Sequence, residues 1–311
     1  MAELSSETRF LHVIEMGLGA WQWGDRVVWQ YGHGYGDEDV RQAFQASLDE
    51  GIRFVDTAEI YGNGRSERLL GQFLKETEQP VLIATKFLPF PWRFGKGALL
   101  RALKGSLARL GVESVDLYQI HGPTPLMSID TMMAGLAECV KAGMTRTVGV
   151  SNFSQSQMLA AYSALARHGI PLASNQVHYS LLNRTVEKNG TLARCKELGI
   201  RLIAYSPIEM GVLTGKYGVG FPPPGARSRM YANLLPKLGK LLKLMTEIGQ
   251  DHGGKSHTQI ALNWVICKGA LPIPGAKNAA QALENTGGLG WRLTDEEVAT
   301  LDRESDAILD S

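Results

Sequence analysis

Four residues have the types and the spacing needed to transfer a proton to a carbonyl compound. Asp56, Lys86 and His121 each follow directly after a short apolar run, and Tyr61 lies five residues after Asp56. A lysine ammonium favours the anionic form of a neighbouring phenol, so we expect the pKa of Tyr61 to fall toward working pH, while Asp56 keeps Lys86 charged. Tyr61 can then donate a proton to a carbonyl oxygen, and an N–H of His121 can hydrogen-bond the same oxygen.

Two other interpretations use the same residues. In one, Asp56 and Lys86 form a structural ion pair and His121 is an ordinary core histidine. In the other, Lys86 is the Schiff-base nucleophile of an aldolase-type enzyme. We favour proton transfer because apolar strands rarely place an Asp, a Lys and a His together at the same end by chance.

The elements that must position these residues recur regularly along the chain. Short apolar runs, each ending in a polar residue, follow one another at intervals of 24 to 35 residues, which is the length of a βα unit. The polar residues at their ends are Asp56, Lys86, His121, Asn152, Gln176 and Ser206. Between them, the pattern predicts helices over residues 37–50, 99–110 and 154–167, the last with Ser154 as its N-cap. Strands that are apolar throughout and alternate with helices indicate a parallel sheet buried on both faces.

Residues 14–20 and 271–276 complete a set of eight strands, and residues 11–15 are a further candidate for extended structure. No G-x-G-x-x-G follows any strand, and no linker divides the chain. We therefore predict an α/β fold: an eight-stranded parallel (β/α)8 TIM barrel that spans residues 1–311 as a single domain. The polar strand ends would meet at one mouth. A long irregular loop after strand 7, residues 208–235, would cover a cofactor there.

Composition excludes several classes of protein. Lys and Arg number 32 against 31 Asp and Glu, a net charge of +1, which argues against a nucleic-acid partner. The sequence has no 18-residue apolar window and no signal-peptide pattern at its N-terminus, so we expect no membrane partner. Cys139, Cys195 and Cys267 lie far apart, which argues against disulfides and a metal site. We expect a cytoplasmic protein that is a monomer by default.

A series of motifs extends over nearly the whole chain. Residues 54–67, FVDTAEIYGNGRSE, are followed in order by the motifs at 84–86, 116–121, 148–153, 175–177, 205–207, 213–217, 273–277 and 284–285. Together they resemble the signature of the aldo-keto reductase family, in the branch that includes bacterial and plastid oxidoreductases and potassium-channel β-subunits. The resemblance implies a barrel that reduces aldehydes and ketones with NADPH. It also implies that Asp56, Tyr61, Lys86 and His121 are catalytic, with Tyr61 as the proton donor.

The resemblance further implies which residues bind NADPH/NADP⁺. Ser151, Asn152 and Gln176 would hold the carboxamide, with which amide side chains can pair, and Tyr205 would stack on the nicotinamide ring. At the other end, the 2′-phosphate and the adenine would meet Lys277, Gln281, Glu284 and Asn285. The remaining cofactor-binding residues would be Gly19, Ala20, Trp21, Ser206, Pro207, Ile208, Gly211, Lys216, Arg227 and Gly275.

One position departs from another branch of the family, which has an arginine where this chain has Gln281. We therefore expect the preference for NADPH to depend more on Lys277, Lys216 and Arg227. Lys277 also precedes a predicted helix, whose N-terminus favours an anion.

The substrate pocket is expected among the aromatic residues near the mouth, and we assign Trp21 and Trp92 to it. The substrate would be a small aldehyde or ketone. Sugar aldehydes, pyridoxal, methylglyoxal and lipid-derived aldehydes all stay open. A second hypothesis comes from another class of protein: an NADPH-binding regulatory subunit with little turnover of its own.

Overall fold

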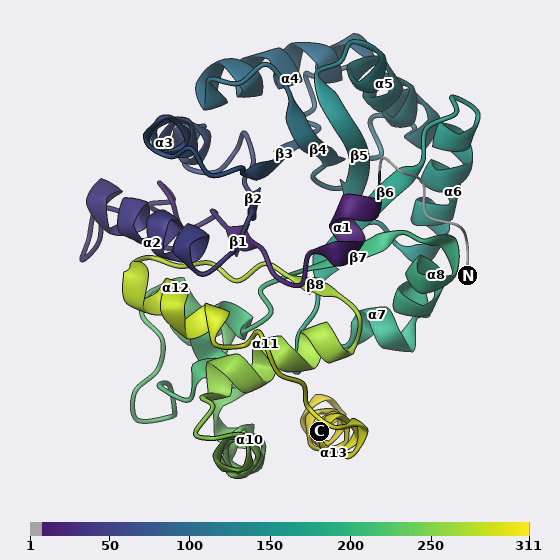
Figure 1. The fold of residues 1–311 in the computed structure, drawn as a ribbon. Coiled ribbons are helices and arrows are strands. Elements are labelled where there is room, and N and C mark those ends of the chain that lie inside the picture. Colours follow the sequence, from purple (N-terminus) through teal and green to yellow (C-terminus); the bar gives the residue numbers. More distant parts are fainter. Residues whose placement is uncertain (1–7, 311) are drawn as a thin grey trace.

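The computed structural model describes residues 8–310 and forms a ring of eight parallel strands in chain order (Figure 1). Each strand coincides with one of the predicted apolar runs, so the predicted TIM barrel is confirmed. Residues 1–7, which are part of the N-terminal stretch where we expect no signal peptide, and Ser311 lie outside the described residues. The strands are β1 (Leu18–Gly19), β2 (Phe54–Asp56), β3 (Leu82–Phe87), β4 (Val115–Ile120), β5 (Thr145–Ser151), β6 (Leu172–His178), β7 (Arg201–Tyr205) and β8 (Leu271–Pro272).

The first and last strands join and close the ring. The Gly17 N–H donates to the Pro272 carbonyl over 3.0 Å, and the Gly19 N–H donates to the Pro274 carbonyl over 2.9 Å. A Cβ at Gly19 would lie 2.7 Å from the Ile273 carbonyl oxygen, so only glycine allows this approach. Backbone bonds between β1 and the segment around β8 thus complete the barrel.

Most helices surround the ring, whereas α1 lies across one end of it (Figure 1). Serine and threonine caps begin several of them: Ser128, Ser154, Ser256 and Thr294 each accept a hydrogen bond from the third helical N–H. The predicted helix with Ser154 as its N-cap is confirmed, and the helices expected at 37–50 and 99–110 are present. The helices are α1 (Arg9–Val13), α2 (Asp37–Asp49), α3 (Arg65–Phe73), α4 (Gly97–Leu110), α5 (Ile129–Lys141), α6 (Gln155–Ala166), α7 (Thr185–Lys188), α8 (Thr191–Leu198), α9 (Ala226–Met230), α10 (Gly239–Asp251), α11 (His257–Cys267), α12 (Ala279–Thr286) and α13 (Asp295–Leu309).

The segment after β7 is more ordered than expected. In place of an irregular loop, residues 208–235 contain the 3₁₀ segment η2 (Glu209–Thr214) and the short helix α9, and a further 3₁₀ turn, η3 (Leu235–Lys237), begins at the end of this range. The turns form because left-handed backbone at Met210 and Gly211 lets the chain reverse within a few residues.

The interior of the barrel is apolar at the amino ends of the strands. There a cluster of buried side chains contains Leu11, Phe54, Leu117, Ile203 and Leu271. Leu11 comes from α1, so the expectation of extended structure over residues 11–15 is wrong for residues 11–13. A single helical turn lets Leu11 point into the barrel, where it is 0% exposed, while Val13 on the same helix is 74% exposed.

Two further findings bear on the other expectations. Cys139, Cys195 and Cys267 are free thiols. Within residues 8–310, no helix has both the length and the apolar character to cross a membrane.

The first prediction concerns the packing of α1 against the interior of the barrel, where Leu11 is buried. Replacing Leu11→Ala removes buried apolar atoms and leaves a cavity, so it should lower the free energy of unfolding by about 3 kcal/mol. Val13→Ala, on the exposed side of the same helix, should change it by less than about 0.5 kcal/mol. Urea unfolding followed by circular dichroism measures both. Equal effects of the two variants would show that the packing of Leu11 inside the barrel does not stabilise the fold.

Candidate active site

A buried ammonium group lies at the centre of the site. Lys86 on β3 is 0% exposed, and its Nζ donates to a carboxylate oxygen of Asp56 on β2, which is 2% exposed. The same Nζ donates to the Thr57 carbonyl over 2.8 Å and to the Tyr61 hydroxyl over 3.3 Å. The parallel pairing of β2 with β3 places Asp56 opposite Ala84, two residues before Lys86. Neighbouring strands therefore bring the ammonium and the carboxylate together, and the turn after β2 adds the phenol.

The pKa of Tyr61 differs from the expectation. Burial raises the pKa of Tyr61, and although the Lys86 ammonium lowers it, the net shift is upward. The expected fall toward working pH is therefore wrong for the protein without ligands, because desolvation of the phenolate outweighs the attraction of the ammonium. Burial also lowers the pKa of Lys86, but Asp56 and Tyr61 more than offset this, and the pKa of Lys86 is raised. Lys86 thus stays charged beside a phenol that keeps its proton.

His121 follows β4 and lies next to Tyr61, with their ring centroids 5.6 Å apart at an interplanar angle of 84°. Burial, helped by the Lys86 charge, lowers the pKa of His121 to about 3, so the imidazole is neutral at working pH. Its Nδ1 is buried and has no hydrogen-bond partner. Because a buried N–H without a partner is rarer in proteins than a buried acceptor without one, the single proton belongs on Nε2. His121 therefore offers one N–H donor at the site.

Two glutamines complete the environment of the carboxylate. Gln176 Nε2 on β6 donates to Asp56 Oδ2 over 2.8 Å, and Gln119 Nε2 on β4 donates to the same oxygen over 3.3 Å. Sequence reasoning assigned Gln176 to a carboxamide and missed Gln119. The signal was available, because Gln119 lies two residues before His121 on a strand and so points to the same face.

Asn152 and Tyr205 form a second polar group beside the first. The Tyr205 hydroxyl donates to Asn152 Oδ1 over 2.9 Å, and Asn152 Nδ2 donates to the His121 carbonyl over 3.0 Å. Asn152 has φ +59°, a left-handed conformation that asparagine tolerates better than most residues. The bond to the His121 backbone links this pair to the group around Lys86.

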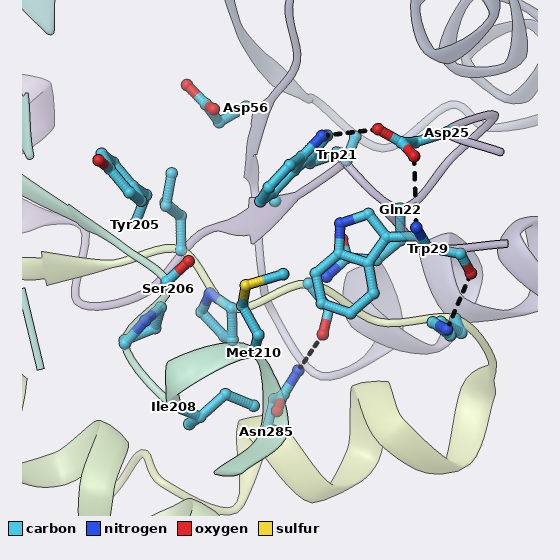
Figure 2. Close-up of a pocket in the computed structure, with 18 of the residues that line it drawn as sticks. Trp21, Gln22, Asp25, Trp29, Asp56, Tyr205, Ser206, Ile208, Met210 and Asn285 are labelled. Atoms are coloured by element: carbon cyan, nitrogen blue, oxygen red, sulfur yellow. Dashed lines mark hydrogen bonds between the residues drawn. The ribbon is translucent and has the colours of Figure 1, made fainter. Parts of the chain in front are cut away.

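One cavity of about 730 Å³ lies beside these groups (Figure 2). Figure 2 shows Asp56 and Tyr205 on one side of it and Trp29 on the other. All the residues predicted to bind cofactor line this cavity, as do Asp56, Tyr61 and His121, while Lys86 lies buried behind them. Among the lining residues that sequence reasoning did not assign are Gln22, Asp25, Trp29, Ile60, Leu88, Met210, Tyr217 and Thr258.

The structure brings one of the two predicted substrate residues into the cavity. Trp21 lines it, lies 6.3 Å from the Tyr61 ring, and donates from Nε1 to Asp25 Oδ2 over 3.0 Å. Trp92 does not line it: its ring stacks on Phe90 at 4.8 Å and is 70% exposed. Of the segment after β3, Leu88 lines the cavity, whereas Trp92 packs against Phe90 at the surface.

The far end of the cavity carries positive charge against aromatic rings. Lys277 Nζ lies 5.1 Å from the Trp29 ring and 4.4 Å from the Tyr35 ring, and the Arg227 guanidinium lies 4.9 Å from Trp29. Burial, together with the charges of Arg227 and Lys216, lowers the pKa of Lys277 to about 8. Arg227 is 6% exposed, and its Nε has no hydrogen-bond partner. Neighbouring cations that repel one another, one of them buried with a free N–H, form a site for an anion.

The residues near α12 complete this end. Gln281 Oε1 accepts the backbone N–H of Lys277 over 3.0 Å, and Asn285 Nδ2 donates to the Gly275 carbonyl over 3.3 Å. These contacts hold the turn that carries Lys277. With amides at one end, cations at the other and aromatic faces between them, the cavity fits the dinucleotide expected from the sequence.

Comparison with known proteins finds a matching family model and a similar reductase. The model of the "Aldo/keto reductase family" matches residues 15–306. Pyridoxal reductase, chloroplastic, of Arabidopsis thaliana is 41% identical over 306 residues, which cover 94% of this chain and 83% of the relative.

Two solved structures are similar as well. A glycerol dehydrogenase from Gluconobacter oxydans superposes with a TM-score of 0.81 at 28% identity, covering 96% of this chain and 93% of that chain. An aldo/keto reductase from Klebsiella pneumoniae, solved in complex with NADP and acetate, gives a TM-score of 0.74 at 27% identity, covering 93% of this chain and 90% of that chain.

The second prediction follows from the pKa of about 3 at His121, which lies below its ordinary value of 6.5. As the pH falls below 6.5 the unfolded chain binds this proton first, so the contribution of His121 to stability is complete above pH 6.5 and is lost on acidification. Between pH 7 and pH 5 the loss should be about 2 kcal/mol. Urea unfolding at both pH values should show a drop that is smaller by about this amount in His121→Asn. An equal drop in both proteins would contradict the neutral, buried imidazole.

Proposed function

The chain belongs to the aldo/keto reductase family, and we propose that it reduces aldehydes and ketones to alcohols with NADPH, using Tyr61 as the proton donor. The observation that carries the proposal is the position of Lys86 Nζ, which contacts both the Asp56 carboxylate and the Tyr61 hydroxyl beside the cavity. NADP in the Klebsiella pneumoniae relative supports the choice of cofactor. We treat residues 1–311 as one domain, and a cytoplasmic monomer stays a prediction.

The proposed reaction needs a hydride and a proton. NADPH, when bound, supplies the hydride to the carbonyl carbon. His121 orients the substrate by donating from Nε2 to the carbonyl oxygen, and Tyr61 transfers its phenolic proton to that oxygen as it becomes an alkoxide. Lys86 then stabilises the tyrosinate that is left, at a hydroxyl oxygen 3.3 Å from its Nζ. Asp56 keeps Lys86 charged throughout.

The chain's own groups would hold the cofactor along the cavity. Tyr205 offers a ring face for the nicotinamide, and the cations at the far end would bind the 2′-phosphate. Gln176 Nε2 is occupied by Asp56, so its oxygen is the atom left to accept from the carboxamide. The two ends differ in charge, which would orient the cofactor in one direction.

The substrate end of the cavity favours neutral carbonyl compounds. Its walls include Trp21, Ile60 and Leu88. The nearby cations are already paired, Arg65 with Asp37 and Arg93 with Glu59. An aromatic aldehyde such as pyridoxal, the substrate in the name of the Arabidopsis relative, is therefore the first compound to test.

The alternatives receive less support. A Schiff-base lysine must lose its proton to attack a carbonyl, whereas Asp56 and Tyr61 raise the pKa of Lys86. A regulatory subunit without turnover would not need the phenol, the ammonium and the imidazole within reach of one substrate oxygen.

The third prediction tests the proton donor. Tyr61→Phe should lower kcat/KM for aldehyde reduction about 10³-fold, because the phenol is the general acid. The Kd for NADPH should change less than about twofold, since the hydroxyl acts on the substrate oxygen. Tyr162→Phe on the outer helix α6 is the matched control and should keep full turnover. NADPH oxidation with pyridoxal and small aldehydes measures the rates, and full turnover in Tyr61→Phe would refute the assignment.

The fourth prediction tests the anion site. Lys277→Met should raise the Kd for NADPH roughly 10- to 100-fold and leave the Kd for NADH within about threefold, because a charge-assisted hydrogen bond to the 2′-phosphate is lost. Since the pKa of Lys277 is about 8, the affinity of the unmodified protein for NADPH should fall as the pH rises past 8, and the variant should lose this trend. Quenching of tryptophan fluorescence gives each Kd. Lys240→Met on α10 is the control. Equal losses for both cofactors would place the phosphate elsewhere.

A further inference from the structure

A buried carboxylate at the start of the segment after β7 joins three parts of the molecule. Glu209 is 3% exposed. Its Oε1 lies 2.7 Å from His178 Nε2 at the end of β6 and also accepts the Ser180 hydroxyl. Its Oε2 accepts the Tyr231 hydroxyl, just after α9, over 3.0 Å. The carboxylate therefore connects the two ends of the segment that lines the cavity, and connects both to the barrel.

The backbone around Glu209 is held in an unfavourable conformation. Ser206, Glu209 and Met210 have φ values of +51°, +49° and +50°, in the left-handed region that side chains disfavour. The Glu209 N–H donates to the Ser206 carbonyl over 2.9 Å and closes this tight turn. Backbone strain of this kind persists where surrounding contacts hold it, and it collects at functional sites. The Glu209 carboxylate adds contacts that tie this turn to His178 on β6 and to Tyr231 after α9.

The orientation of His178 follows from its two partners. Asn183 Nδ2 lies 2.8 Å from Nδ1 and donates to it, so Nδ1 is the acceptor and the proton is on Nε2. The Nε2–H then donates to Glu209. Both nitrogens of the ring are engaged, which leaves the imidazole no freedom to turn about its own bonds.

The imidazole of His178 supports the ring of Tyr205. The two rings stack with centroids 5.3 Å apart and an interplanar angle of 15°. Tyr205 also lines the cavity, and its hydroxyl is held by Asn152. Glu209 does not line the cavity, yet it fixes the plane of the ring that does.

We propose that Glu209 is a positioning residue for the nicotinamide half of the cofactor: through His178 it holds the Tyr205 ring on which the nicotinamide stacks. This inference rests on the proposed function, since it requires NADPH in the cavity. A Tyr205 ring that is already held in one orientation binds the nicotinamide ring better than a mobile Tyr205 ring would, because less side-chain conformational entropy is lost on binding.

The test separates the two halves of the cofactor. Glu209→Gln keeps the shape of the side chain and removes its charge and its second acceptor. The Kd for NADPH should rise about tenfold, while the Kd for adenosine 2′,5′-bisphosphate, which lacks the nicotinamide, should change less than about twofold. Glu197→Gln on α8, an exposed carboxylate paired with Arg194, is the matched control and should change neither constant.

Other results would overturn the proposal. Equal weakening of both ligands would mean that Glu209 only maintains the fold of the segment, and no weakening of either would mean that it has no role in binding. Failure of the unmodified protein to bind NADPH would instead overturn the proposed function, so the two failures are distinguishable.

A double variant checks the route through His178. His178→Asn alone should weaken NADPH binding about tenfold, and Glu209→Gln combined with His178→Asn should weaken it no further than the larger single effect. The absorbance and emission of bound NADPH should change in both single variants if the ring platform has moved. Additive losses of affinity would contradict the coupling, as would an unchanged Kd in His178→Asn.

Discussion

The structure of the mouth depends on keeping one ammonium group charged without water around it. An unpaired buried charge costs several kcal/mol, so Lys86 requires the Asp56 carboxylate, and that carboxylate in turn requires donors for its second oxygen. Gln119 and Gln176 supply them from two further strands. The ammonium on β3 therefore depends on side chains from β2, β4 and β6. These side chains can reach it because parallel strands end at the same edge of the barrel. Tyr61 is placed where it can use the resulting charge.

The strands and their polar ends could be predicted from the sequence because a strand buried on both faces is apolar throughout, and a polar residue that follows one stands out. Asp56, Lys86 and His121 were found in this way. The shift of the Tyr61 pKa could not be predicted, since it is the difference between a burial effect and a charge effect that oppose each other. The helix at Arg9–Val13 was not predicted, because an element of five residues is too short to show the periodic spacing of apolar residues that marks a helix.

The position of long side chains was the least predictable feature. Trp92 is an aromatic residue of the kind that often lines pockets, but it lies exposed on the segment after β3. Glu209 looked unremarkable in the sequence, because its role depends on a left-handed turn that brings together residues from β6 and from the end of α9. Trp29 and Tyr35 were missed as partners of Lys277, since they meet it across nearly the full length of the chain. Contacts of this kind arise from closure of the barrel, which local patterns do not encode.

The seam between β1 and β8 has a mechanical consequence. These strands have two residues each, whereas β3 to β6 have six or seven. The barrel therefore has more strand pairing on the side that carries Lys86 and Gln176 than on the side where Gly19, Ile273 and Gly275 line the cavity, and we expect the first side to be the stiffer. Local opening of the ring, which amide hydrogen exchange would register, should begin at this seam. The division suits a catalyst, because the reacting groups need fixed geometry whereas a large ligand needs a wall that can yield as it enters.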